Sequence, residues 1–321
     1  MSLLESVAIV LGLVVFEIVN SVDNAVVNAS VLKTMSLLWR KRFLLIGIVT
    51  SVFIVRFILP LIILWISVPA ISLQEMFLAF SGQSDIGAHA IEMQKPVILA
   101  FGGIFLLLLY FHWLFLEKKD PLYIERFIKE KFGVWFFAVA ALVLVVVMYL
   151  SRANSTMMLA AAIGSATFFL VYGLKETAEK NEANIIAGSS LGDLSKFVYL
   201  EVLDSTFSFD GVIGAFAFTV NLLLIFIGLG IGALVMRELT IKGIDTISKY
   251  KYLKNGALTS IGFLGLFMLV EAFGLELPSY IPTIVTFIVI GIAFYASYRL
   301  LPKSTQPNQS LTQKLRSKLH K

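Results

Sequence analysis

Two apolar stretches of the sequence carry carboxylates at places where lipid hydrocarbon would otherwise surround the chain. The first, FEIVNSVDNAVVNAS, begins at Phe16, and the second, YLEVLDSTFSFDGVIGAFAFT, begins at Tyr199. Their acidic residues are Glu17, Asp23, Glu201, Asp204 and Asp210. An ionised carboxylate at the centre of a bilayer costs about 2.5–3.5 kcal/mol on insertion scales, so this set requires compensating positive charge.

Positive charge inside the predicted membrane spans is scarce, because Arg56 is the only basic residue deep within one of them. One arginine cannot neutralise five acids, so either several acids are protonated or a cation lies among them. A divalent cation can accept carboxylate, amide and hydroxyl oxygens together. The predicted metal ligands are Glu17, Asn20, Asp23, Asn24, Glu201, Asp204, Ser205 and Asp210, with Arg56 as a candidate counter-ion.

The ligand types narrow the choice of metal. Oxygen ligands suit Mg²⁺, Ca²⁺ or Mn²⁺ and disfavour metals that prefer thiolate or imidazole. The chain has no cysteine, and its three histidines, at positions 89, 112 and 320, are scattered, so we expect neither a zinc or copper site nor a permanent cofactor. Because ligands must be deprotonated to bind a metal, the same acids could exchange protons as the metal leaves.

Helical geometry makes the polar side chains of each stretch converge. At about 100° per residue, the first stretch has one polar stripe, which carries Glu17, Asn20, Asn24 and Asn28, with Asp23 beside it. One face of the second stretch carries Glu201, Asp204, Ser205 and Ser208. Asp210 points away from that face in a regular helix, and a local unwinding before Gly211 would turn it back. For Asn28, a hydrogen bond to a neighbouring helix is as reasonable as a ligand role.

The spacing of the acids also repeats. Six residues separate Glu17 from Asp23, and the same spacing separates the last two aspartates of the second stretch. Related segments that cross a membrane in opposite directions are typical of an inverted-repeat transporter, whose site lies near the midplane where the repeats meet. The first and sixth predicted spans would be related in this way.

The elements that must position these residues are transmembrane helices. The chain is 58% hydrophobic and only 15% charged, which excludes an ordinary soluble globular protein and indicates an all-α, polytopic membrane bundle. The predicted spans lie near residues 3–32, 43–68, 96–116, 134–150, 158–174, 197–219, 222–237, 255–273 and 281–301. The first span is long enough to contain a break.

Connections rich in lysine and arginine alternate along the chain with connections that hold almost none, so the basic residues gather on one side of the nine spans. The basic connections include those that begin at Lys33, Glu117, Lys175 and Arg237, and the tail after Leu301 is basic as well. The other connections hold almost no basic residues, so the N-terminus is predicted outside and the C-terminus inside, in the inner (plasma) membrane. The formal charge of +5 therefore reflects basic loops, and no nucleic-acid partner is expected.

Residues 1–301 form the predicted transmembrane transporter domain, with acidic motifs at 17–28 and 201–211. Residues 70–96 are mixed in character and are predicted to form an external loop with a short interfacial helix. Residues 302–321 form a basic cytoplasmic tail that is expected to be disordered or to rest on anionic lipid. The lipid bilayer is the expected environment, and the sequence is compatible with either a monomer or a homo-oligomer.

At these acidic motifs the sequence resembles the TerC family of integral membrane proteins, of the LysE transporter superfamily. The resembling pieces are the two acidic stretches and the late segment YKYLKNGALTSIGFLGLFMLVEAFGLELPSYIP. The chain departs from the family pattern at Gly211, where a serine is usual, and in the insertion 70–96, as in a divergent branch. The resemblance implies manganese efflux, with the five acids as residues of the metal pathway.

The leading hypothesis is therefore a secondary transporter that exports a divalent cation, with Mn²⁺ ahead of Ca²⁺ and Mg²⁺. A transporter of Ca²⁺ or of protons alone would use the same acids, and so would an assembly or insertion factor with a hydrophilic groove. An intramembrane diaspartyl protease is disfavoured, because FDGVIG is not a protease motif and GLGIG lacks an aspartate. We expect no enzymatic activity.

Overall fold

The computed structural model describes residues 2–47, 56–67, 72, 74, 75, 78, 85–128, 133–186, 192–242 and 249–301. Within its helices a few side chains, among them those of Asp23 and Asn24, lie outside the described part. The described residues form helices and no strands, which confirms the all-α prediction. The helices of the first half are α1 (Leu3–Asn20), α2 (Val22–Leu32), α3 (Leu37–Gly47), α4 (Arg56–Ser67), α6 (Asp85–Met93), α7 (Lys95–Leu116) and the short 3₁₀ helix η2 (Ile124–Phe127). Those of the second half are α8 (Trp135–Leu150), α9 (Ser155–Ile186), α10 (Asp193–Ala215), α11 (Leu222–Lys242), α13 (Leu253–Ala272) and α14 (Tyr280–Leu300).

Six of these helices are long and apolar enough to cross a membrane, so the chain is a membrane protein. They are α1, α7, the first part of α9 to Thr177, the first part of α11 to Leu239, α13 and α14. Each of the nine predicted spans overlaps at least one described helix. The shorter α8 is apolar as well, whereas α10 carries the second acidic stretch. The helix α6 lies within the segment 70–96, where a short helix is predicted.

The first predicted span is broken, as its length suggested. Helix α1 ends at Asn20 and α2 begins at Val22, with Ser21 between them at φ −88° and ψ 1°. The amide of Ser21 still donates to the carbonyl of Glu17 at 3.0 Å, and that of Ala25 donates to the carbonyl of Ser21 at 3.0 Å. The break is therefore a local distortion that keeps the two helices in line.

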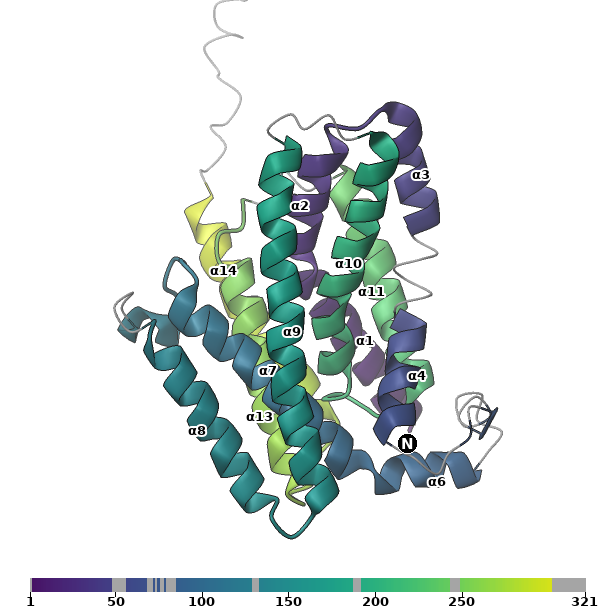
Figure 1. Cartoon of the computed structure of the whole chain (residues 1–321), viewed down its shortest axis with the longest axis vertical. Coiled ribbons are helices and arrows are strands. Elements are labelled where there is room, and N and C mark those ends of the chain that lie inside the picture. The colour runs from purple at the N-terminus through teal and green to yellow at the C-terminus, as the bar shows by residue number, and fades with distance from the viewer. Residues whose placement is uncertain are drawn as a thin grey trace, which may run out of the picture.

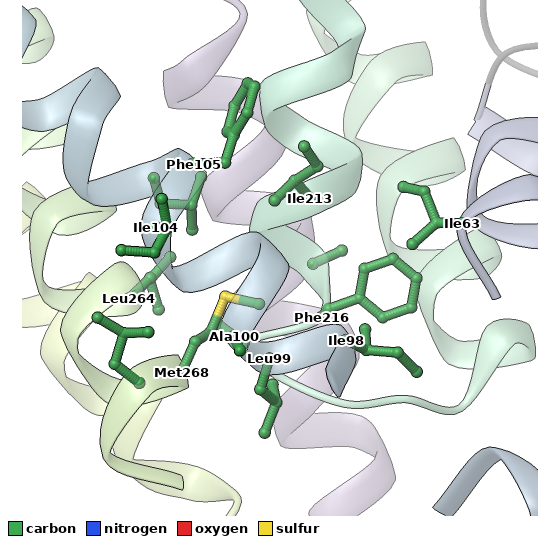
Figure 2. Close-up of a cluster of buried hydrophobic side chains, with 14 of the residues drawn as sticks. Ile63, Ile98, Leu99, Ala100, Ile104, Phe105, Ile213, Phe216, Leu264 and Met268 are labelled. Carbon is green, nitrogen blue, oxygen red and sulfur yellow. The ribbon is translucent and has the colours of Figure 1, made fainter. Parts of the chain in front are cut away.

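Helix α7 is the centre of the bundle. It is hydrophobic on all sides, as expected for a helix surrounded by other helices, and it packs against α8, α9 and α13. Figure 2 shows side chains of α7, among them Ile104 and Phe105, beside Leu264 and Met268 of α13 and Ile213 of α10. Apolar burial around α7 thus holds the two halves of the chain together.

Glycines let α7 and α13 approach closely. A Cβ atom on Gly103 would lie 3.0 Å from the carbonyl oxygen of Gly265, and one on Gly265 would lie 3.1 Å from the carbonyl oxygen of Gly103. Small residues at such crossings are typical of membrane helices, which gain van der Waals contact when their backbones come close. The two helices are antiparallel, since Lys95 of α7 pairs with Glu271 of α13 at 3.7 Å at one end, and Glu117 pairs with Lys254 at 2.8 Å at the other.

The connections divide between the two ends of the bundle (Figure 1). The N-terminus and the connection between α8 and α9 lie at the lower end of this view, and α3 and the upper ends of α9 and α10 lie at the opposite end. The basic connections after α7 and before α13 also share one end, because Lys251 pairs with Asp120 at 2.9 Å. The nine-span topology that the charge pattern predicts stays a prediction.

Replacing Gly164 of α9 by alanine is expected to destabilise the protein by about 1–3 kcal/mol, the range for an overpacked core. The added Cβ would lie 2.3 Å from the carbonyl oxygen of Phe101 on α7, and backbone cannot move aside as a flexible side chain can. Gly173→Ala on the same helix is the matched control, because nothing lies within 4 Å of its Cβ. Thermal unfolding in detergent should show a lower midpoint for Gly164→Ala alone, and equal midpoints would contradict the observed approach of α9 to α7.

Candidate functional site

The broken helix α1–α2 and helix α10 lie against each other in opposite directions. A Cβ on Gly214 would meet the ring of Phe16, and farther along the pair Asn28 Nδ2 donates to Asp204 Oδ1 at 3.4 Å. At the end of the pair, Ser36 donates its hydroxyl to Asp193 Oδ2 at 2.5 Å. In these contacts the residue numbers rise along α1–α2 and fall along α10. The two acidic stretches are therefore antiparallel and in contact.

Glu17 lies at the centre of this arrangement with only 1% of its surface exposed. Arg56 of α4 donates from Nη2 to Glu17 Oε1 in a buried ion pair, and Arg56 itself is 4% exposed. The hydroxyl of Ser21 donates to the same oxygen at 2.8 Å. A buried charge is tolerated only when it is paired and hydrogen-bonded, and Glu17 has both kinds of partner.

Two glycines make room for Glu17. A Cβ on Gly211 of α10 would lie 2.7 Å from Glu17 Oε2 and 3.6 Å from Asn20 Nδ2. A Cβ on Gly232 of α11 would lie 2.7 Å from the Cβ of Glu17. The carboxylate of Glu17 is therefore enclosed between α10, α11 and α4. Gly211, where the TerC pattern has a serine, is the residue that allows this approach.

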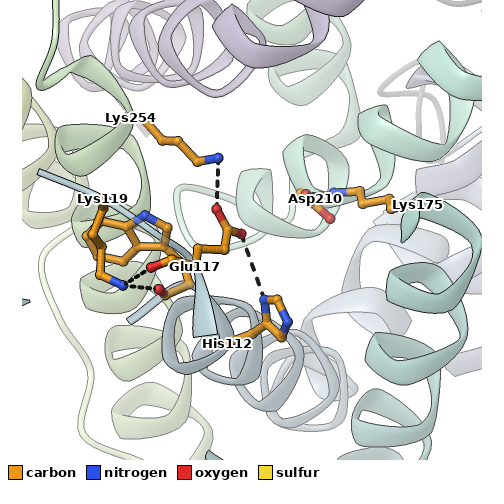
Figure 3. A network of polar contacts seen from close by, with 7 residues as sticks. His112, Glu117, Lys119, Lys175, Asp210 and Lys254 are labelled. Atoms are coloured by element: carbon orange, nitrogen blue, oxygen red, sulfur yellow. Dashed lines mark hydrogen bonds and ion pairs between the residues drawn. The ribbon is translucent and has the colours of Figure 1, made fainter. Parts of the chain in front are cut away.

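Asp210 is the second deeply buried acid, at 6% exposure, and it pairs with Lys175 of α9 (Figure 3). The local unwinding considered before Gly211 does not occur, because α10 is helical from Asp193 to Ala215. Asp210 consequently keeps the direction of a regular helix, toward α9. Its Oδ1 is buried and accepts no hydrogen bond from the described part of the chain.

Arg237 of α11 is the third basic residue in this region. It donates to the carbonyl oxygen of Phe43 and its guanidinium lies 4.6 Å from the centre of that ring. The guanidinium of Arg237 interacts electrostatically with the carboxylates of Asp204 and Glu201, and it is repelled by Arg56. Glu201 and Asp204, in the N-terminal half of α10, and the arginines of α4 and α11 thus belong to one electrostatic network.

Lys175 and Arg237 add positive charge to the region in which Arg56 was predicted as the only deep basic residue. Both lie two residues before the end of the apolar, membrane-length parts of α9 and α11, whereas the charge pattern assigned them to connections. The predicted span 158–174 is shorter than the roughly 20 residues that cross a bilayer, and extending it would have brought Lys175 into the membrane. Arg237 is the last residue of the predicted span 222–237, so both signals were present in the sequence.

Of the remaining predicted ligands, the structure describes the side chain of Ser205 but not those of Asp23 and Asn24. Ser205 donates its hydroxyl to the carbonyl of Glu201 at 2.7 Å, as Ser208 does to the carbonyl of Asp204 at 2.7 Å, so both hydroxyls lie along α10. The side chains of Asp23 and Asn24 lie outside the described part. Among the side chains that the structure describes, no group of three or more acidic or histidine residues is close enough to hold a metal ion.

The described site is thus a buried layer of ion pairs contributed by both halves of the chain. Its acids are Glu17, Glu201, Asp204 and Asp210, and its bases are Arg56, Lys175 and Arg237. Four acids against three bases leave one negative charge among these described residues when all are ionised. Such intramembrane charges mark ion or substrate pathways more often than they serve packing alone.

Comparison with known proteins identifies a family but no function. Residues 22–301 match the family described as "Protein of unknown function (DUF475)". No curated protein and no solved structure matches the chain. The family match extends from α2 to the end of α14, and so includes most of the buried layer described above. The chain therefore belongs to the DUF475 family.

Proposed function

We propose that this protein is a secondary transporter that exports a divalent cation, with Mn²⁺ as the first substrate to test, and that proton movement accompanies the cation. The observation that carries the proposal is the antiparallel contact of α1–α2 with α10, which places the buried Glu17 beside Gly211 and the buried Asn28 beside Asp204 of the opposed helix. Opposed helices with acidic and amide oxygens at their contact are what an inverted-repeat cation transporter requires. The proposal includes nine spans, an outside N-terminus and a plasma-membrane location. It also includes a distant relation to the TerC family.

The charge balance of the layer supports a dication. The net charge of the seven described groups is −1 when all are ionised. A hard divalent cation would offset this excess and would take carboxylate and amide oxygens. Asn28 offers such an oxygen, because its Oδ1 is buried and accepts no hydrogen bond within the described part. Binding would require the acids to exchange their basic partners for the cation.

Transport of protons without a metal is the second candidate, and one observation favours it. Glu17 and Asp210 are already paired with basic side chains, and the described residues hold no ready cluster of metal ligands. Acids that alternate between a basic partner and a proton can carry protons through a bundle. Both candidates use the same layer, so only a flux measurement separates them.

The test is flux into proteoliposomes that contain the purified chain, a Mn²⁺-sensitive dye and a pH-sensitive dye. We expect Mn²⁺ entry above that of empty liposomes, with a pH change in the lumen and with competition by other divalent cations that ranks their affinities. Proton flux without any divalent cation flux would establish the second candidate instead. No flux of either kind, from protein shown to be folded by its thermal unfolding, would refute both.

A further inference from the structure

A cavity of about 310 Å³ lies at the end of α7 opposite Lys95, away from the buried layer. Its walls come from the end of α7, the connection that follows and the approach to α8. Charged residues of both signs line it: Glu117, Lys118, Lys119, Glu125 and Arg126. The volume lies at the lower end of the range for small-molecule sites, which suits the headgroup of one lipid.

The two acids of the cavity are both held by other parts of the protein. Glu117 accepts Lys254 at 2.8 Å and lies 3.8 Å from the Nδ1 atom of His112 (Figure 3). Glu125, which is 2% exposed, accepts the amide of Leu122 at 2.9 Å and the side-chain amide of Asn255 through Oε1, while its Oε2 is buried without a hydrogen-bond partner among the described residues. These contacts hold the connection against the start of α13, and three basic residues against two acids leave the lining with a net positive charge.

The three basic residues differ in how much charge remains available. The ammonium group of Lys119 is engaged with the carbonyl oxygens of Trp113 and Glu117 at the end of α7 (Figure 3). Arg126 donates from Nη2 to the carbonyl of Leu122, and a guanidinium has further N–H groups to offer. Lys118 and Arg126 are both exposed side chains on the rim. Among the described residues, Lys118 and Arg126 therefore supply the positive charge that remains available at the cavity.

Large apolar residues stand next to the lining residues in the chain: Ile124 and Phe127 flank Glu125 and Arg126, and Trp135 follows soon after Gly133. Ile124, Phe127 and Trp135 are exposed, with Phe127 at 75%. Large apolar groups beside basic residues at the end of a membrane-spanning helix are expected at the boundary between headgroups and acyl chains, where each kind of group finds a favourable environment. A soluble anion would use the basic residues but would leave the apolar rim in water, whereas a phospholipid satisfies both.

We propose that this cavity binds the phosphate of an anionic phospholipid such as phosphatidylglycerol, through Lys118 and Arg126, with the acyl chains beside Phe127 and Trp135. Basic pockets between membrane helices are suited to anionic headgroups, because phosphate accepts several charge-assisted hydrogen bonds at once. The site does not depend on the proposed transport function. It predicts a structural lipid at the connection between α7 and α8, where that connection meets the start of α13.

The experiment is native mass spectrometry of the full chain released from micelles that contain equal amounts of phosphatidylglycerol and phosphatidylcholine. Wild-type protein should retain phosphatidylglycerol preferentially. Lys118→Gln and Arg126→Gln should each lower that retention roughly fivefold, and the double variant should lower it about thirtyfold. Lys251→Gln is the control, because Lys251 is an exposed basic residue at the same end that pairs with Asp120 and does not line the cavity.

Three outcomes would overturn the proposal. The first is equal retention of the two lipids by the wild type, and the second is an equal effect of all the variants, control included. The third is displacement of phosphatidylglycerol by millimolar inorganic phosphate, which would show a site for a free anion instead of a lipid. Because the replaced side chains are exposed, thermal unfolding should confirm that every variant is folded.

Discussion

Replacing Arg56 by methionine is expected to destabilise the protein by about 3–5 kcal/mol, the range for removing one partner of a buried ion pair. Glu17 would remain enclosed between α10 and α11, with the hydroxyl of Ser21 as its remaining hydrogen-bond donor among the described residues. Methionine fills a volume close to that of the arginine stem, so the loss measures charge and hydrogen bonding more than space. Thermal unfolding in detergent, or the yield of folded protein, is the measurement.

The double variant Glu17→Gln/Arg56→Met should recover most of that loss, because it removes both charges together. Replacing a buried ion pair by neutral groups of similar size is often nearly neutral, whereas breaking it is costly. Equal instability of the single and double variants would show that Arg56 acts by shape alone. Arg126→Met offers a control for loss of an arginine, since Arg126 is exposed and lies outside the buried layer.

Asp210→Asn is expected to reduce cation flux in proteoliposomes to the level of empty vesicles. Asparagine keeps the shape of the side chain but removes the charge that a departing or arriving cation needs at this depth. The ammonium group of Lys175 loses its carboxylate at the same time. Since the Lys175 side chain is 13% exposed, it can extend toward water, and we expect a smaller loss of stability than for Arg56→Met.

Glu276→Gln is the matched control for this experiment, because Glu276 is an exposed acid that lies after the end of α13. It should leave flux unchanged and should show that losing a carboxylate is harmless outside the layer. Wild-type flux in the Asp210→Asn variant would remove Asp210 from the pathway. If Asp210→Asn both loses flux and unfolds, the double variant Lys175→Met/Asp210→Asn separates the two effects, because neither charge of the pair remains unpaired in it. Absence of flux from the folded double variant would support a role of Asp210 in transport.

The membrane class, the helical architecture and the burial of two acids were accessible from the sequence. Only helices and closed barrels satisfy the hydrogen bonds of the backbone in lipid. Barrel strands are short and alternate apolar with polar residues, so continuous apolar runs of bilayer length indicate helices. Glu17 and Asp210 interrupt such runs, and both are buried in the structure. The length of the first predicted span also indicated the break that the structure places at Ser21.

The partners of those acids were decided by the tertiary structure. Each residue turns a helix by about 100°, so an uncertainty of one or two residues in a helix end changes which neighbour a side chain faces. Lys175 comes directly after the predicted span 158–174 and Arg237 is the last residue of 222–237, and the pairing of Asp210 with Lys175 follows from a regular α10 packed on α9. Gly211 and Gly232 enclose Glu17 only because three helices cross at that point. Such contacts join residues far apart in the sequence, and no local pattern determines the rotation and depth of one helix against another.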